Sequence, residues 1–120
     1  MPREDQHLDK AKKNERFAES LNRSDVIAGE WAVVAVFYAA LHYVQAYFSK
    51  FSVEARCHHD RFDQIKRDQK IKTVITSYKY LYALSRTARY QCGSLPTDAY
   101  EKSKSYLADV KKHIEPVLRS

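Results

Sequence analysis

The segment DVIAGEWAVVAVFYAALHYVQAYFSKF, residues 25–51, decides the fold because it is long, unbroken and apolar on nearly every side. From Trp31 to Leu41 it carries no charged side chain. A helix that is apolar all round has to contact neighbours on more than one side, so this segment predicts the central helix of a helical domain. Ser24 and Asp25 supply N-cap side chains at its start.

Three further long helices are predicted around it. Residues 4–22 form an amphipathic outer helix with a balanced mixture of charges. A third helix has apolar or small side chains at steps of three and four: Ile71, Val74, Ile75, Tyr78, Leu81, Tyr82 and Ser85. Gly93 and Pro96 end it, and Thr97 caps a fourth helix with its own apolar stripe: Tyr106, Leu107, Val110, Ile114, Val117 and Leu118. Pro116 should weaken only the last turn.

The connection between the second and third long helices is polar, and residues 58–67 within it are compatible with a short helix. Low glycine and proline contents, 2 and 3 residues, suit long helices with few turns. Neither a repeat nor a Pro/Gly/Ser linker divides the chain. We therefore predict an all-α single domain over residues 1–120, an antiparallel four-helix bundle with a short extra helix between its second and third long helices.

Composition indicates a cytoplasmic protein. Hydrophobic residues make up 44% and charged residues 30% of the 120 residues, which is ordinary for a globular domain. Two cysteines are too few for a disulfide framework, and the N-terminus is charged where a secretory signal is apolar. His42, Gln45 and several tyrosines within residues 25–51 favour a buried core helix over a membrane span. We predict no membrane association and no cofactor.

Positive charge is concentrated in the second half of the chain. Residues 1–25 carry six basic and six acidic side chains, whereas residues 69–97 carry five basic side chains and no carboxylate, within a net charge of +6. Such a segment favours polyanionic partners such as RNA or nucleotide phosphates, or it serves only to keep the protein soluble.

Four side chains on the third helix are candidates for nucleic-acid or nucleotide binding. They follow one another at helical spacing on one flank: Tyr82, Arg86, Arg89 and Tyr90. Aromatic rings stack on bases and guanidinium groups pair with phosphate oxygens, which is the combination that single-strand binders use. The alternative is that Tyr82 belongs to the core and the arginines pair with carboxylates such as Asp98 or Glu101.

Histidines supply the remaining candidates. His58 and His59, with Arg61, are placed to contact phosphate or to lie on a surface turn. With Cys57 beside them they still fall short of the four converging ligands of a structural zinc site, so no metal site is predicted. His42 is either a hydrogen-bonded core residue or a general base. If the chain is an enzyme, its catalytic candidates are His42, His58, His59 and Arg86.

Three elements taken in order resemble the HEPN superfamily. They are WAVVAVFYAALHYVQAYF, the histidines in ARCHHDRFDQI, and YLYALSRTARY followed by a capped final helix. Residues 37–42 look like the second helix of that family, and residues 86–90 look like its Arg-x-x-Ala-Asp-Tyr element, with Arg89 in place of the acidic residue. The resemblance covers about residues 25–118.

The resemblance implies a helical bundle that often forms homodimers and often acts beside a nucleotidyltransferase in defence or toxin-antitoxin systems. It also implies a link to metal-independent ribonucleases, which carry Arg, four to six residues, then His. This chain lacks that spacing, because the first histidine after Arg86 and Arg89 is His113. The first hypothesis is therefore a module that dimerises through its second and fourth helices and binds RNA or a nucleotide-bearing partner. The alternatives are a diverged endoribonuclease and a purely structural protein partner.

Overall fold

A computed structural model describes residues 2–21, 24–90 and 95–120. Within these ranges every regular element is helical and no strand occurs. The helices in chain order are α1 (Glu4–Ser20), α2 (Val26–Lys50), α3 (His58–Arg67), the short 3₁₀ helix η1 (Lys72–Val74), α4 (Ile75–Tyr90) and α5 (Ala99–Leu118). The predicted all-α class is confirmed, as is the short helix between the second and third long helices.

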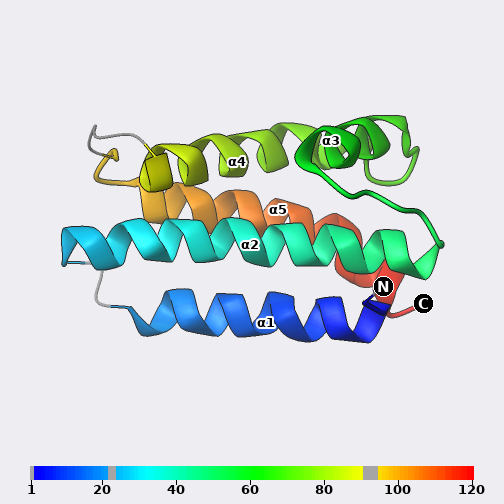
Figure 1. Ribbon diagram of the computed structural model, residues 1–120, viewed down its shortest axis with the longest axis horizontal. Coiled ribbons are helices and arrows are strands. Elements are labelled where there is room, and N and C mark those ends of the chain that lie inside the picture. The colour runs from blue at the N-terminus through cyan, green and yellow to red at the C-terminus, as the bar shows by residue number, and fades with distance from the viewer. Residues whose placement is uncertain (1, 22–23, 91–94) are drawn as a thin grey trace.

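The four long helices lie side by side along a molecule of 40 × 24 × 24 Å, and each runs opposite to the long helix before it (Figure 1). α2 contacts α1, α4 and α5, and α4 also contacts α5. Both chain ends lie at the end of the molecule where α2 finishes (Figure 1). There the Nζ of Lys50 donates a hydrogen bond to the backbone oxygen of Ser120 at 2.8 Å.

Burial of α2 accounts for its apolar sequence. Its large side chains Phe37, Tyr43 and Tyr47 are almost fully buried among the other helices. By length and composition alone α2 also meets the requirements of a membrane-spanning helix, and 56% of its apolar window is buried inside the molecule. The large apolar side chains that α2 leaves exposed lie near its first turns, where Val26 and Ile27 face solvent. Asp25 caps the helix by accepting a hydrogen bond from the Ala28 amide at 3.0 Å.

Some predicted helix ends need correction. The first helix ends at Ser20, two residues before the predicted Asn22, which lies outside the described residues. The predicted third helix starts with the 3₁₀ turn η1, and α4 itself begins only at Ile75. Both Ile71 and Val74 are nevertheless fully buried, so the apolar stripe extends through the turn as predicted.

The start of the last helix is also shifted. Asp98, not Thr97, occupies the N-cap position of α5, and its carboxylate pairs with Lys102 at 3.5 Å. Pro96 accepts a backbone hydrogen bond from the Ala99 amide, which begins the helical turn at that point. The predicted helix stop at Gly93 lies outside the described residues. Pro116 lies inside α5, which continues for two more residues to Leu118.

Small side chains hold α1 on the molecule. Ala11 and Ala18 are its buried residues, and α2 is the helix that it approaches closely. Alanines let two helix backbones approach, but they bury little apolar surface, so α1 depends on polar contacts as well.

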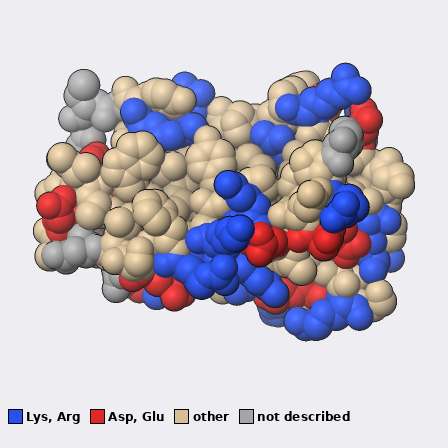
Figure 2. Space-filling model, turned by 60° about the horizontal axis from the view of Figure 1, so that its bottom comes forward, with Lys and Arg blue, Asp and Glu red and all other residues tan. Residues whose placement is uncertain are grey.

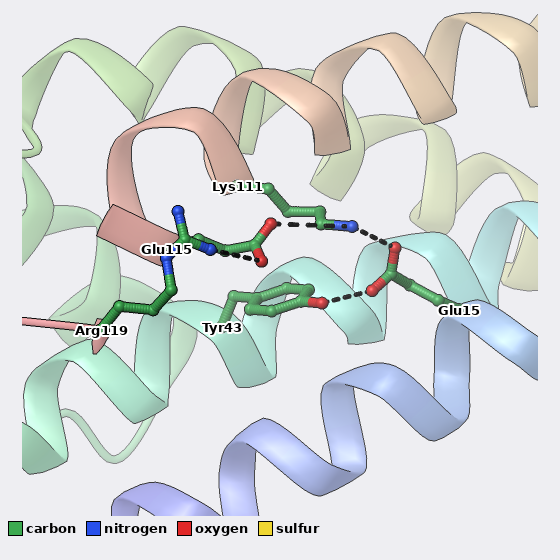
Figure 3. A network of polar contacts seen from close by, with 5 residues as sticks. All are labelled: Glu15, Tyr43, Lys111, Glu115 and Arg119. Carbon is green, nitrogen blue, oxygen red and sulfur yellow. Dashed lines mark hydrogen bonds and ion pairs between the residues drawn. The ribbon is translucent and has the colours of Figure 1, made fainter. Parts of the chain in front are cut away.

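Those polar contacts form a network between three helices (Figure 3). Glu15 of α1 accepts hydrogen bonds from the Tyr43 hydroxyl of α2 and from the Lys111 ammonium of α5, the latter at 2.8 Å. Lys111 also pairs with Glu115 at 3.8 Å, and Glu115 pairs with Arg119 at 3.7 Å. Burial and the neighbouring Glu15 carboxylate raise the pKa of Tyr43, so its hydroxyl keeps the proton that it donates.

Two hydrogen bonds from α2 fix the segment that carries α3. The Gln45 amide donates to the Ala55 carbonyl at 2.8 Å, just before the helix. The Tyr47 hydroxyl donates to the Asp68 carboxylate at 2.8 and 2.9 Å, just after it. Both ends of α3 are therefore anchored to the central helix, which sets the direction in which its side chains point.

Candidate functional site

Arg89 links the end of α4 to the middle of α2. Its Nη1 donates to the Tyr38 hydroxyl at 2.8 Å, and its Nε donates to the Ser85 carbonyl at 3.4 Å. The guanidinium carbon lies 4.8 Å from the centre of the Tyr90 ring. Guanidinium groups at such distances over an aromatic face gain a cation–π attraction, so the side chain is held from three sides.

Arg86 lies one turn earlier on the same flank of α4 and is exposed. Its Nη1 donates to the Tyr82 hydroxyl at 3.2 Å. Its guanidinium carbon lies 5.8 Å from the Tyr82 ring centre and 5.7 Å from the Tyr90 ring centre. The predicted alternation of aromatic and guanidinium groups on α4 is thus present in the structure.

Arg61 of α3 faces the same flank but is buried, with 7% of its surface exposed. Its Nη2 donates to His58 Nδ1 at 3.0 Å, and its Nη1 lies 3.5 Å from the Ala55 carbonyl. Within the described part of the chain, no hydrogen bond with acceptable geometry reaches its Nε or the buried Tyr78 hydroxyl. Burial raises the pKa of Tyr78 to about 12, although the nearby Arg61 charge opposes that rise.

His58 lies close enough to all three arginines to be affected by them. Burial lowers the pKa of His58, and the charges of Arg61, Arg89 and Arg86 lower it further. Its ring centre is 4.6 Å from that of Tyr82. We call Arg61, Arg86 and Arg89, with His58, Tyr38 and Tyr82, the arginine cluster.

The arginine cluster has no carboxylate among the residues that the structure describes. None of its three guanidinium groups makes an ion pair within residues 2–21, 24–90 and 95–120. The suggested partner Asp98 is paired with Lys102 instead. A buried cation without a counter-charge is costly, because the hydrogen bonds of Arg61 to His58 and Ala55 replace only part of the lost hydration and supply no negative charge. The cluster is therefore electrostatically suited to an anion from outside the chain.

His42 lies in a different contact, between α1 and α2. Its Nδ1 is 3.0 Å from the Nδ1 of His7, and the two rings are stacked with centres 5.3 Å apart. Burial lowers the pKa of His42 to about 4, and the charges of His7, Lys10 and Arg61 add to this effect. His42 is thus a neutral, hydrogen-bonded residue of a helix interface at neutral pH. This agrees with the first of its two interpretations, a hydrogen-bonded core residue.

His59 points away from the arginine cluster. Its side chain is 83% exposed, and its Nε2 lies 3.8 Å from the Asp63 carboxylate on the same helix. Cys57 is an exposed free thiol. No group of three or more His, Cys, Asp or Glu side chains that could hold a metal ion occurs in the described part of the chain.

Two parts of the site were not predicted from the sequence. Tyr38 was named only within a family motif, because the sequence does not show that this residue of α2 contacts Arg89, 51 positions later. The pocket beside Arg89, between the start of α2 and the end of α4, was not predicted either, although its lining residues Arg89 and Tyr90 were binding candidates. The single tryptophan, Trp31, also lines that pocket.

Comparison with protein-family models and with curated proteins finds no match for this chain. The resemblance to the HEPN superfamily therefore remains a prediction from the quoted residues. Function has to be argued from the site itself.

Proposed function

We propose that this protein binds single-stranded RNA or a nucleotide-bearing partner through the arginine cluster. The observation that carries the proposal is Arg61, a buried guanidinium with no carboxylate partner among the described residues. Exposed Arg86 and half-buried Arg89 extend the same positive surface along α4. A phosphate group bound by Arg86 and Arg89 accepts their guanidinium N–H groups in pairs and brings the missing negative charge close to buried Arg61.

Aromatic rings beside the arginines support RNA rather than a simple anion. Tyr82 and Tyr90 lie against Arg86, and Tyr38 and Tyr90 lie against Arg89. Phosphates alone do not need aromatic neighbours, whereas unpaired bases stack on them.

The contacts of His58 favour binding over cleavage. A guanidinium group can only donate, so His58 Nδ1 accepts from Arg61 and the neutral ring carries its proton on Nε2. In this state neither ring nitrogen is free to take a proton from a ribose hydroxyl. The diverged endoribonuclease hypothesis therefore requires Arg61 to move, and the binding hypothesis does not.

Family-level features are part of the same proposal. We infer an antiparallel four-helix bundle of HEPN type that acts in the cytoplasm, with a nucleotidyltransferase as its protein partner. Homodimerisation through the second and fourth long helices, α2 and α5, is proposed as well, and it is supported by Val26 and Ile27, which face solvent at the start of α2. Sedimentation equilibrium tests it, because a dimer has twice the monomer mass and a concentration-dependent one dissociates on dilution.

The test of RNA binding is fluorescence anisotropy of a labelled single-stranded RNA across a salt series. The double variant Arg86→Gln/Arg89→Gln is compared with the parent protein. Each lost phosphate contact lowers the slope of log K against log salt by about 0.7 for a single strand, so the double variant should lose about 1.4. The RNA is examined afterwards for cleavage, with chelator present.

Lys70→Gln/Lys72→Gln is the matched control, because it removes the same charge from the same basic segment outside the arginine cluster. Equal losses in both double variants would show that only net charge matters and would contradict the proposal. Parent protein that binds no RNA at low salt would favour the purely structural partner. Chelator-resistant cleavage that disappears in His58→Ala would favour the endoribonuclease.

A further inference from the structure

A pocket of about 340 Å³ lies beside the arginine cluster. It is formed by the start of α2 and the end of α4 and is lined by Glu30, Trp31, Val34, Ala88, Arg89 and Tyr90. Its volume is within the range of small-molecule sites, about 300 to 1,000 Å³. Arg89 belongs both to this pocket and to the arginine cluster, so the two sites are continuous.

The two aromatic rings of the pocket are exposed to solvent. Trp31 is 55% exposed and Tyr90 is 67% exposed, whereas Phe37, Tyr43 and Tyr47 of the core are almost fully buried. The end of the molecule where α2 begins presents a broad area without charged side chains on the face drawn in Figure 2, on its left. A folded chain gains nothing from leaving such rings in water, so a ligand that covers them would be stabilised.

Charge decides which part of a nucleotide enters the pocket. Glu30 is an acidic lining residue, and its carboxylate repels a phosphate group. Arg89 on the opposite wall and Arg86 beside the Tyr90 ring attract one. The phosphate therefore lies over the arginines, and the uncharged base lies over Trp31.

We propose that this pocket binds one base of the RNA strand whose phosphate is held by the arginine cluster, with the base stacked on Trp31 and Tyr90. The proposal rests on the proposed function and adds a site for the base to it. Stacking is possible for every base, because each has a π-face, so the site accepts single strands without a strict sequence.

Trp31 reports on its own pocket, because it is the one tryptophan of the chain. Its fluorescence is measured while AMP or ribose 5-phosphate is added. AMP should quench the emission saturably, because its base stacks on the indole. Ribose 5-phosphate carries the phosphate and no base. It should therefore displace labelled RNA at a higher concentration than AMP does, and it should not quench the emission of Trp31.

Substitutions separate the base pocket from the phosphate contacts. Trp31→Ala should weaken RNA binding about tenfold, the lower range of losses for one stacked base, and leave the salt slope unchanged because no phosphate contact is lost. Tyr90→Ala keeps the fluorescent residue and should reduce quenching by AMP. Tyr80→Ala is the matched control, since Tyr80 is a similarly exposed tyrosine of α4 that stacks on Tyr106 instead.

Two results would overturn the base pocket while leaving the proposed function intact. One is salt-dependent RNA binding that Trp31→Ala does not weaken and that causes no quenching. The other is a dimer that Trp31→Ala converts to a monomer with unchanged RNA affinity, which would make the pocket a contact between two copies of the chain. A parent protein that binds no RNA would refute both proposals together.

Discussion

Acid should loosen the contact between α1 and α2 through His42. Its ring pairs with His7, and the charged groups that lower its pKa are His7, Lys10 and Arg61, all cationic when protonated. A second proton at this interface therefore meets only like charges. The substitution that tests this is His42→Gln, which keeps a polar side chain and removes the titration.

The size of the effect follows from the two pKa values. The pKa of His42 falls from 6.5 to about 4 on folding, so the unfolded chain binds more protons between these values and stability is lost as the pH falls. Complete protonation of His42 corresponds to a loss of about 3 kcal/mol in the free energy of unfolding, at about 1.36 kcal/mol per unit of pKa difference. Because the ring is partly exposed, solvent screening reduces this loss. We therefore expect the free energy of unfolding to fall by about 1 to 2 kcal/mol between pH 6.5 and pH 4.

Urea unfolding followed by circular dichroism at a series of pH values measures the effect. The quantity compared is the change in the free energy of unfolding between pH 7 and pH 4.5, which should be smaller in His42→Gln than in the parent. Carboxylates that titrate in the same range contribute equally to both proteins and cancel in the comparison.

His59→Gln is the control, since it removes an exposed histidine away from the α1–α2 interface. The free energy of unfolding of this variant should change with pH as that of the parent protein does. An acid-induced loss of stability that is the same in the parent and in His42→Gln would refute the reasoning, because the His7–His42 contact would then have no part in it.

Three further substitutions test the packing by urea unfolding. Tyr43→Phe removes a hydrogen bond to Glu15 and should cost about 1 kcal/mol, whereas a neutral result would mean that Lys111 alone satisfies this carboxylate. Ala11→Leu should cost about 1 to 3 kcal/mol, because Ala11 is fully buried where α1 packs against α2 and a larger side chain there forces the two helices apart. Arg61→Met should raise stability by about 1 kcal/mol and weaken RNA binding, since it removes a buried charge that only a ligand neutralises, and reduced stability would contradict this account.

Hydrophobic periodicity was enough to find the helices, but not the contacts of their polar side chains. The apolar run of residues 25–51 and the stripe through Tyr78 and Leu81 identify core faces, because burial acts on whole faces of a helix. Helix ends such as Thr97 depend on single hydrogen bonds and were missed by a residue. The meeting of Arg89 with Tyr38, or of His7 with His42, depends on how each helix is rotated about its axis, and spacing along one helix does not contain that information.

The position of the two chain ends has a practical consequence for engineering. Because Ser120 lies beside Lys50 at the end of α2 while Trp31 lies near its start, segments fused to either terminus emerge at the end of the molecule away from the pocket (Figure 1). Because both chain ends lie at the same end of the molecule, a linker across that end joins them and lets the chain be reopened elsewhere (Figure 1). The exposed connection around Ser52, between α2 and α3, is a natural place for the new ends of such a circular permutant.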